Sequence, residues 1–165
     1  MTLRGRVWKY GNNVDTDVIL PGRYCHITDT KELAKHAMED LDPSFAKEVR
    51  SGDVVVGGNN FGCGSSREVA PGSLKAAGIS CVIANSFARI FFRNCINIGL
   101  PIVESGEFAS RCSKGDEVEI DLEKGELRNR ANGARSTVAP YPPEIRAIID
   151  AGGLLPYIRK TKLMI

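Results

Sequence analysis

Two short apolar runs enclose a glycine-rich turn, and this feature constrains the fold more than any other part of the sequence. Residues 54–56 read VVV and residues 81–84 read CVIA. Between them lie the turn NNFGCGSS and a segment with helical spacing of apolar residues that ends at Gly78. A second helical segment leads to a third apolar run, LPIV. Buried strands that alternate with helices are typical of a parallel sheet with right-handed crossovers.

The remaining segments predict an α/β fold in which antiparallel strands accompany this parallel strand–helix core. Residues 115–138 alternate apolar and polar side chains around two turn signals, which indicates an antiparallel meander or a small barrel element. Because the chain has no repeat, linker or low-complexity tract, we expect residues 1–165 to form a single domain. The other expected elements are a strand at 3–11, a short extended stretch at 18–20, helices at 28–41, 66–78 and 86–99, and one or two helices at 142–162.

Composition and cysteine spacing narrow the class of protein. The formal net charge is +2 and the Lys and Arg residues are scattered, which does not point to nucleic acid or a membrane surface. No run approaches the ~20 apolar residues of a membrane span, and the first residues lack a signal-peptide core, so we expect a cytoplasmic protein. The five cysteines are widely spaced without a CxxC pair. We therefore expect no metal or iron–sulfur site held by this chain alone.

The glycine-rich turn has the composition of an anion-binding site. A loop that leaves a strand and opens a helix exposes backbone N–H groups, and Arg67 adds a planar fork for a carboxylate or phosphate. Three common motifs are excluded by sequence: the Walker lysine is missing, Arg67 replaces the third glycine of a dinucleotide fingerprint, and Cys63 replaces the first glycine of a nucleophile elbow. A simpler interpretation is a capping box, in which Ser65 or Ser66 caps the helix and Glu68 reaches back.

Three segments, NNFGCGSSRE, SFARIFFRN and GLPIV, occur in this order and spacing. They resemble the swivel domain of the aconitase superfamily, and in particular the separate small subunits of the 3-isopropylmalate dehydratase and homoaconitase families. GNNVDTDVILPGRY and AGGLLPYIRK are also similar, so the resemblance covers nearly the whole chain. It implies a swivelling β/β/α domain that moves against a large subunit carrying a [4Fe–4S] cluster. This chain would bind no cofactor and would be catalytically silent alone.

The resemblance also implies roles for individual residues in the dehydration and rehydration of a small hydroxy-dicarboxylate. Ser65 matches the catalytic base, and Ser66 and Arg67 match the binders of the substrate carboxylate. A serine alkoxide needs strong stabilisation, for which the backbone N–H groups of the turn and Arg67 are candidates in a dry site. The positions expected to support the site are Asp17, Gly64 and Arg89.

The loop at residues 21–29, PGRYCHITD, is where the resemblance is least direct. In this family the residues after the tyrosine contact the variable part of the substrate: an arginine in homoaconitase-like chains, apolar residues in isopropylmalate-like chains. Here Cys25, His26 and Ile27 occupy this stretch. His26 could donate a hydrogen bond or, when protonated, pair with a carboxylate; alternatively it faces solvent.

Several functions therefore remain open at this point. The first is isomerisation of 2- and 3-isopropylmalate in leucine biosynthesis. Homoaconitase or a hydro-lyase for another alkylmalate, such as dimethylmalate or methylmalate, is the alternative within the class. A non-catalytic module that binds small anions is the alternative outside it. Apolar surface meant for the large subunit would let the isolated chain form a homo-oligomer.

Overall fold

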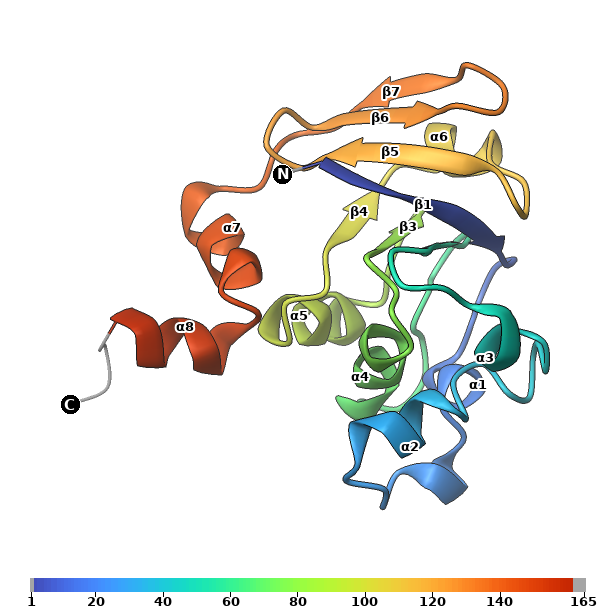
Figure 1. Cartoon of the computed structure of the whole chain (residues 1–165), viewed down its shortest axis with the longest axis vertical. Helices are drawn as coiled ribbons and strands as arrows, with labels where there is room; N and C mark the ends of the chain where they lie inside the picture. Colours follow the sequence, from blue (N-terminus) through green and yellow to red (C-terminus); the bar gives the residue numbers. More distant parts are fainter. Residues whose placement is uncertain (1, 162–165) are drawn as a thin grey trace.

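The computed structural model describes residues 2–161, and its centre is a seven-stranded sheet in the order β4-β3-β2-β1-β5-β6-β7 (Figure 1). The strands are β1 (Thr2–Lys9), β2 (Val54–Val56), β3 (Cys81–Ala84), β4 (Ile102–Glu104), β5 (Glu117–Asp121), β6 (Glu126–Asn129) and β7 (Arg135–Thr137). β1 pairs in parallel with β2 and antiparallel with β5, so it joins the parallel strands to the meander. The predicted α/β class with a parallel core and antiparallel strands is confirmed.

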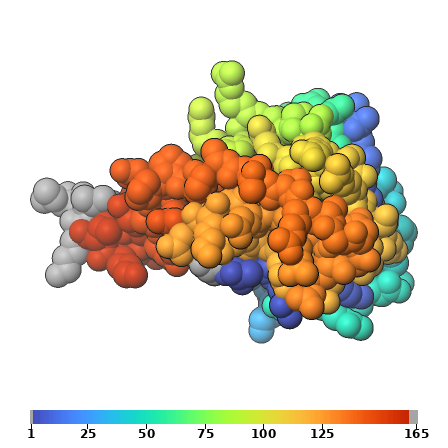
Figure 2. Space-filling model, turned by 90° about the horizontal axis from the view of Figure 1, so that it is seen from above, coloured from blue at the N-terminus to red at the C-terminus, as the bar shows by residue number. Residues whose placement is uncertain are grey.

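The helices are short, and most of them lie beneath the parallel strands (Figure 1). They are α1 (Thr16–Ile19), the 3-10 turn η1 (Gly22–Tyr24), α2 (Thr30–Ala34), α3 (Phe45–Glu48), α4 (Val69–Ala76), α5 (Arg89–Asn97), α6 (Gly106–Ser110), α7 (Pro143–Asp150) and α8 (Leu154–Thr161). Seen from above, α8 projects from one side of the body (Figure 2). No helix within residues 2–161 is long and apolar enough to cross a membrane.

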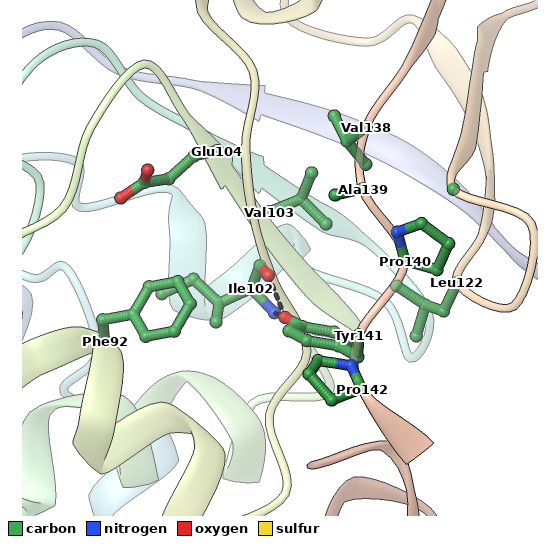
Figure 3. Close-up of a pocket in the computed structure, with 11 residues that line it drawn as sticks. Phe92, Ile102, Val103, Glu104, Leu122, Val138, Ala139, Pro140, Tyr141 and Pro142 are labelled. Atoms are coloured by element: carbon green, nitrogen blue, oxygen red, sulfur yellow. Dashed lines mark hydrogen bonds between the residues drawn. The ribbon is translucent and has the colours of Figure 1, made fainter. Parts of the chain in front are cut away.

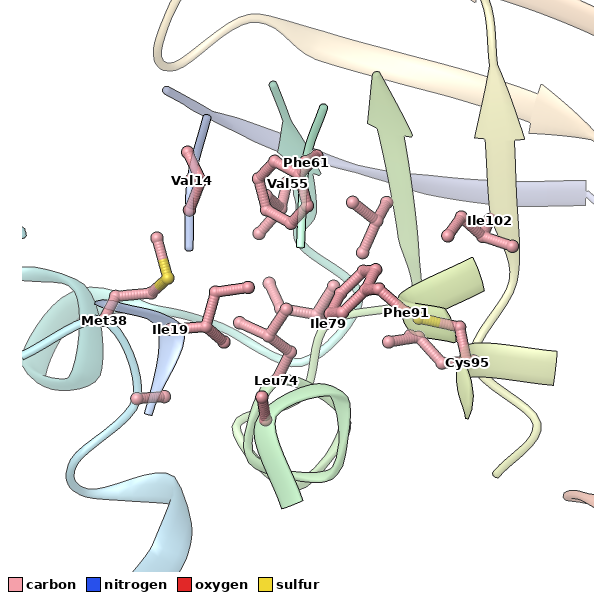
Figure 4. Packing of buried hydrophobic residues seen from close by; sticks show 14 of the residues in the cluster. Val14, Ile19, Met38, Val55, Phe61, Leu74, Ile79, Phe91, Cys95 and Ile102 are labelled. Carbon is pink, nitrogen blue, oxygen red and sulfur yellow. The ribbon is translucent and has the colours of Figure 1, made fainter. Parts of the chain in front are cut away.

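The parallel strands are buried on both faces, which explains their continuous apolar sequence. Val54 and Val56 pack in one cluster with the antiparallel strands, whereas Val55 packs in the other with the helices. Figure 4 shows this second cluster, which includes Val55, Leu74 of α4 and Phe91 of α5. The helices that flank the glycine-rich turn are therefore anchored in the same core as the strand that precedes it.

Two element predictions need correction, and the start of a third element is now defined. Residues 18–20, expected to be extended, belong largely to the one-turn helix α1, because the Asp15 carboxylate caps its start. The helix expected at 28–41 ends at Ala34; Met38 adopts a positive φ of 59° and donates its N–H to Ile19 O instead of extending the helix. The helix expected at 66–78 begins only at Val69, so Pro71 lies in its first turn, where a proline is tolerated.

Candidate functional site

The one-turn helix α1 lies directly against the glycine-rich turn. Thr16 N donates to Cys63 O at 2.8 Å, and Gly62 N donates to Val14 O at 2.7 Å. The buried Thr16 side chain adds a third bond, from Oγ1 to Ser65 O at 2.8 Å. Two backbone hydrogen bonds and one side-chain hydrogen bond therefore join the segment VDTD to the segment GCGS.

Arg67 is oriented by an ion pair with Asp17. The Arg67 guanidinium donates to Asp17 Oδ1 at 2.6 Å, and Gly22 N donates to the same oxygen at 2.7 Å. The Arg67 hydrogen bond, followed by the Gly22 N–H, holds the pKa of Asp17 below its usual range. Asp17 Oδ1 thus links the Arg67 guanidinium to Gly22, near the start of the loop at 21–29.

The segment SFAR braces the other side of the turn. Phe61 N donates to Ser86 O and Ala88 N donates to Phe61 O, both at 3.0 Å. Ser86 Oγ accepts from Asn60 N at 2.8 Å, and α5 begins at Arg89 after an Ala88 cap without a side-chain bond. The helix expected at 86–99 therefore begins three residues later, and Ser86 at the expected start does not cap it. The Ser86 hydroxyl accepts a hydrogen bond from the glycine-rich turn instead.

These three segments enclose a hollow of about 180 Å³, which is the candidate active site. Its lining brings together five of the predicted site residues, which are Gly64, Ser65, Ser66, Arg67 and Arg89. The other lining residues are Thr16, Gly62, Ala88, Ile90, Phe91 and Asn94. Ser65 and Ser66 are exposed, while Arg67 is half-buried. Arg89 also lines the hollow and is exposed, and within residues 2–161 it forms no ion pair. The hollow therefore combines the two serine hydroxyl groups with the guanidinium groups of Arg67 and Arg89.

The serines do not form the predicted capping box. α4 begins at Val69, its cap residue Glu68 makes no side-chain hydrogen bond to the helix, and both serines precede it in the loop. Among the described residues, the N–H groups of Ser65, Ser66 and Arg67 donate to no other protein group. The turn thus presents both hydroxyls and backbone donors on its exposed side, an arrangement suited to an anion.

The residues predicted to contact the variable part of the substrate lie beside this hollow and do not line it. Cys25 and Ile27 are half-buried and line a second hollow of about 400 Å³ between α2 and the first turn of α4. His26 is exposed and lines neither hollow. Arg67 lies between the two regions: it is bound to Asp17, and the nearby Cys25 thiol adds to the effect of Asp17 in raising the pKa of Arg67.

A further hollow, of about 320 Å³, lies at the edge strand β4, away from the serines (Figure 3). Its lining is mostly apolar, and Glu104 is its only carboxylate. Tyr141 covers the free edge of the sheet there: its hydroxyl accepts from Ile102 N at 2.9 Å and donates to Ile102 O. We interpret this hollow as a structural feature of the sheet edge and not as a binding site, because it lacks the nucleophiles and cations of the candidate site.

The cysteines of this chain do not fit the ligand set of an iron–sulfur cluster. Cys81, Cys95 and Cys112 are buried in the two hydrophobic clusters, and burial raises the pKa of each thiol, that of Cys112 to about 11. No group of three or more His, Cys, Asp or Glu side chains that could hold a metal ion occurs within residues 2–161.

Sequence reasoning missed two residues that hold the site, Thr16 and Ser86. Their neighbours, Asp17 and Arg89, were predicted from the motifs VDTD and SFARI. The only signal in the sequence was a hydroxyl residue inside each motif. A Thr or Ser close to a predicted helix is normally interpreted as its N-cap, because both are preferred N-cap residues.

Comparisons with known proteins identify the class to which this fold and site belong. The family model described as the aconitase C-terminal domain matches residues 14–106. A protein named 3-isopropylmalate dehydratase small subunit from Moorella thermoacetica is 55% identical over 163 residues, 98% of each chain. One named isopropylmalate/citramalate isomerase small subunit from Methanocaldococcus jannaschii is 54% identical over 158 residues, 96% of this chain and 94% of that relative.

The solved structures agree with this assignment. A crystal structure of a 3-isopropylmalate dehydratase from Methanocaldococcus jannaschii matches with a TM-score of 0.93 and 47% identity, covering 99% of this chain and 96% of that one. The chain therefore belongs to the aconitase C-terminal domain family, and within it to the branch of the 3-isopropylmalate dehydratase small subunits.

Proposed function

We propose that this chain is the small subunit of a 3-isopropylmalate dehydratase. Together with a large subunit it would interconvert 2-isopropylmalate and 3-isopropylmalate by dehydration and rehydration, in the leucine pathway of the cytoplasm. The names of its relatives support this activity. The observation that carries the proposal is the hollow in which Ser65, Ser66 and Arg67 meet beside backbone N–H groups that have no partner within residues 2–161.

In this proposal Ser65 is the catalytic base. In its ionised form the Ser65 oxygen takes the proton from the substrate carbon during dehydration and returns it during rehydration. The nearby N–H groups and the Arg67 guanidinium stabilise the negative charge of this alkoxide before it takes up the proton. Ser66 and Arg67 bind one substrate carboxylate, and Asp17 keeps the guanidinium in place for that contact.

The large subunit completes the site. Because the cysteines of this chain do not fit a cluster, we assign the [4Fe–4S] cluster to the large subunit, where it would supply Lewis-acid chemistry at the substrate hydroxyl. The serines are exposed in the chain alone, and a lid is needed to exclude water from them. Ile90, which lines the same hollow and is 49% exposed, is an apolar contact for that lid. We propose that residues 1–165 act as one swivelling unit against it.

The charge of the loop at 21–29 favours a substrate with an apolar substituent over a tricarboxylate. Its arginine, Arg23, is already engaged: it donates to Asp40 at 2.7 Å and to Glu39 at 3.2 Å. Cys25 and Ile27 offer half-buried apolar surface instead. An alkylmalate with a smaller substituent is the second candidate, because the name of the Methanocaldococcus relative includes citramalate.

The test is to produce the chain with its cognate large subunit and to assay the complex with isopropylmalate, citramalate and homocitrate. We expect isopropylmalate to be turned over with the highest kcat/KM. Ser65→Ala should lower kcat by at least ~10²–10⁴, the usual contribution of a general base. Ser113→Ala, at an exposed serine outside the candidate site, serves as the matched control and should leave kcat unchanged.

Two results would speak against the proposal. Normal turnover by the Ser65→Ala complex would remove the role of the serine. If no complex formed and no diacid were turned over, while the isolated chain bound phosphate or malate, the chain would be an anion-binding module. Sedimentation of the isolated chain then tells whether it forms a homo-oligomer.

A further inference from the structure

We infer that Thr16 is a positioning residue that sets the orientation of Ser65 and Ser66, an inference that rests on the proposed function. Thr16 is the third residue of VDTD and only 2% of it is exposed. Its Oγ1 donates to Ser65 O at 2.8 Å across 49 residues of sequence. Both serines are exposed, so little side-chain packing constrains the turn at this point.

The hydrogen bond from Thr16 orients the whole peptide group between Ser65 and Ser66, and not only the Ser65 carbonyl. The peptide between Ser65 and Ser66 is trans and planar, so its C=O and N–H point in opposite directions. When Thr16 holds the Ser65 carbonyl on the α1 side, the Ser66 N–H is directed to the opposite, open side of the turn. That N–H has no partner within residues 2–161. Thr16 therefore aims a backbone donor at the place where the substrate or the charged Ser65 oxygen would lie.

The contribution of Thr16 can be separated from the stability of α1. The backbone N–H of Thr16 bonds to Cys63 O, and its backbone O accepts from Leu20 N, and neither bond uses the side chain. The cap of the helix comes from Asp15. Valine has nearly the same shape as threonine, so Thr16→Val keeps the burial and removes only the donor. Thr16→Ala removes the donor without adding a methyl group, and Thr16→Ser restores it.

The experiment measures kcat and KM of the reconstituted complex for each variant, with isopropylmalate as substrate. We expect Thr16→Val and Thr16→Ala to lower kcat by ~10- to 100-fold, since a displacement of about 1 Å in a catalytic group has effects of this size. KM should stay within about threefold, because Arg67 remains held by Asp17. Thr16→Ser should retain kcat within about threefold of the parent. Thermal unfolding and the yield of complex confirm that equal amounts of assembled enzyme are compared.

The outcomes distinguish this inference from the proposed function. Parental kcat for both Thr16→Val and Thr16→Ala, with Ser65→Ala inactive, overturns the role of Thr16 and leaves the function standing. A loss that Thr16→Ser does not rescue, or one that appears in KM alone, also overturns it. If Ser65→Ala itself turns over normally, the proposed function fails first. Should Thr16→Val not assemble with the large subunit, the alanine and serine variants decide the question.

Discussion

Replacement of Gly64 by alanine tests how closely the serine turn is fitted to α1. Gly64 has a φ of +93°, and an added Cβ would lie 2.4 Å from Asp15 Oδ2. The same carboxylate caps α1 by accepting from Asp17 N at 2.7 Å. Gly64→Ala therefore combines two effects, an unfavourable backbone conformation and displacement of the Asp15 cap.

Gly115 provides a matched control because it has nearly the same φ, +91°, with nothing within 4 Å of an added Cβ. The backbone strain is about 1–2 kcal/mol at either position. Loss of the Asp15 cap adds about 1–2 kcal/mol at Gly64 alone. The free energy of unfolding should therefore fall by about 2–4 kcal/mol for Gly64→Ala and by about 1–2 kcal/mol for Gly115→Ala.

The assay compares thermal unfolding of the two variants with their turnover in the reconstituted complex. At about 2–4 °C per kcal/mol for a chain of this size, Tm should fall by about 4–16 °C for Gly64→Ala and about 2–8 °C for Gly115→Ala. Only Gly64→Ala should also lose turnover, by ~100-fold, since it moves the segment that carries Ser65. Equal losses of stability and turnover in the two variants would refute the claim that Asp15 packs against the turn.

Two further predictions concern the rest of the fold. Asp53 is buried and accepts from Arg6, Trp8 Nε1 and Arg50 N; burial raises its pKa, but these bonds outweigh burial and place the pKa below its usual value. Its contribution is therefore present above about pH 4, the unfolded pKa, and is lost as pH falls through the folded pKa. By urea unfolding, the free energy of unfolding of Asp53→Asn should be about 1–3 kcal/mol lower than that of the parent at pH 7. This difference should be smaller at pH 3, and an equal difference at both pH values would contradict the prediction. Tyr141→Phe removes the hydroxyl that serves both Ile102 N and Ile102 O, so we expect a loss of about 1–3 kcal/mol and a lower Tm; an unchanged Tm would show that water or another group satisfies the strand edge.

The strands were predictable from the sequence because their signals are local. VVV and CVIA are apolar on every position, as strands covered on both faces must be, and the alternation in residues 115–138 matches the antiparallel strands. The helix boundaries were less predictable. Met38 N donates to Ile19 O, and the two oxygen atoms of Ser86 accept hydrogen bonds from the glycine-rich turn. In both cases the partner is distant in sequence.

By itself the sequence determined the strand–turn–helix order, the resemblance to the aconitase swivel domains and the motif positions Ser65, Ser66 and Arg67, because each depends on residues close together in the chain. Only the tertiary structure decided how VDTD meets GSSR. Thr16 binds Ser65 across 49 residues and Asp17 binds Arg67 across 50. The packing of α1 and α4 on the common core brings these partners together, and the direction of a hydroxyl or a carboxylate after such packing has no counterpart in local sequence pattern.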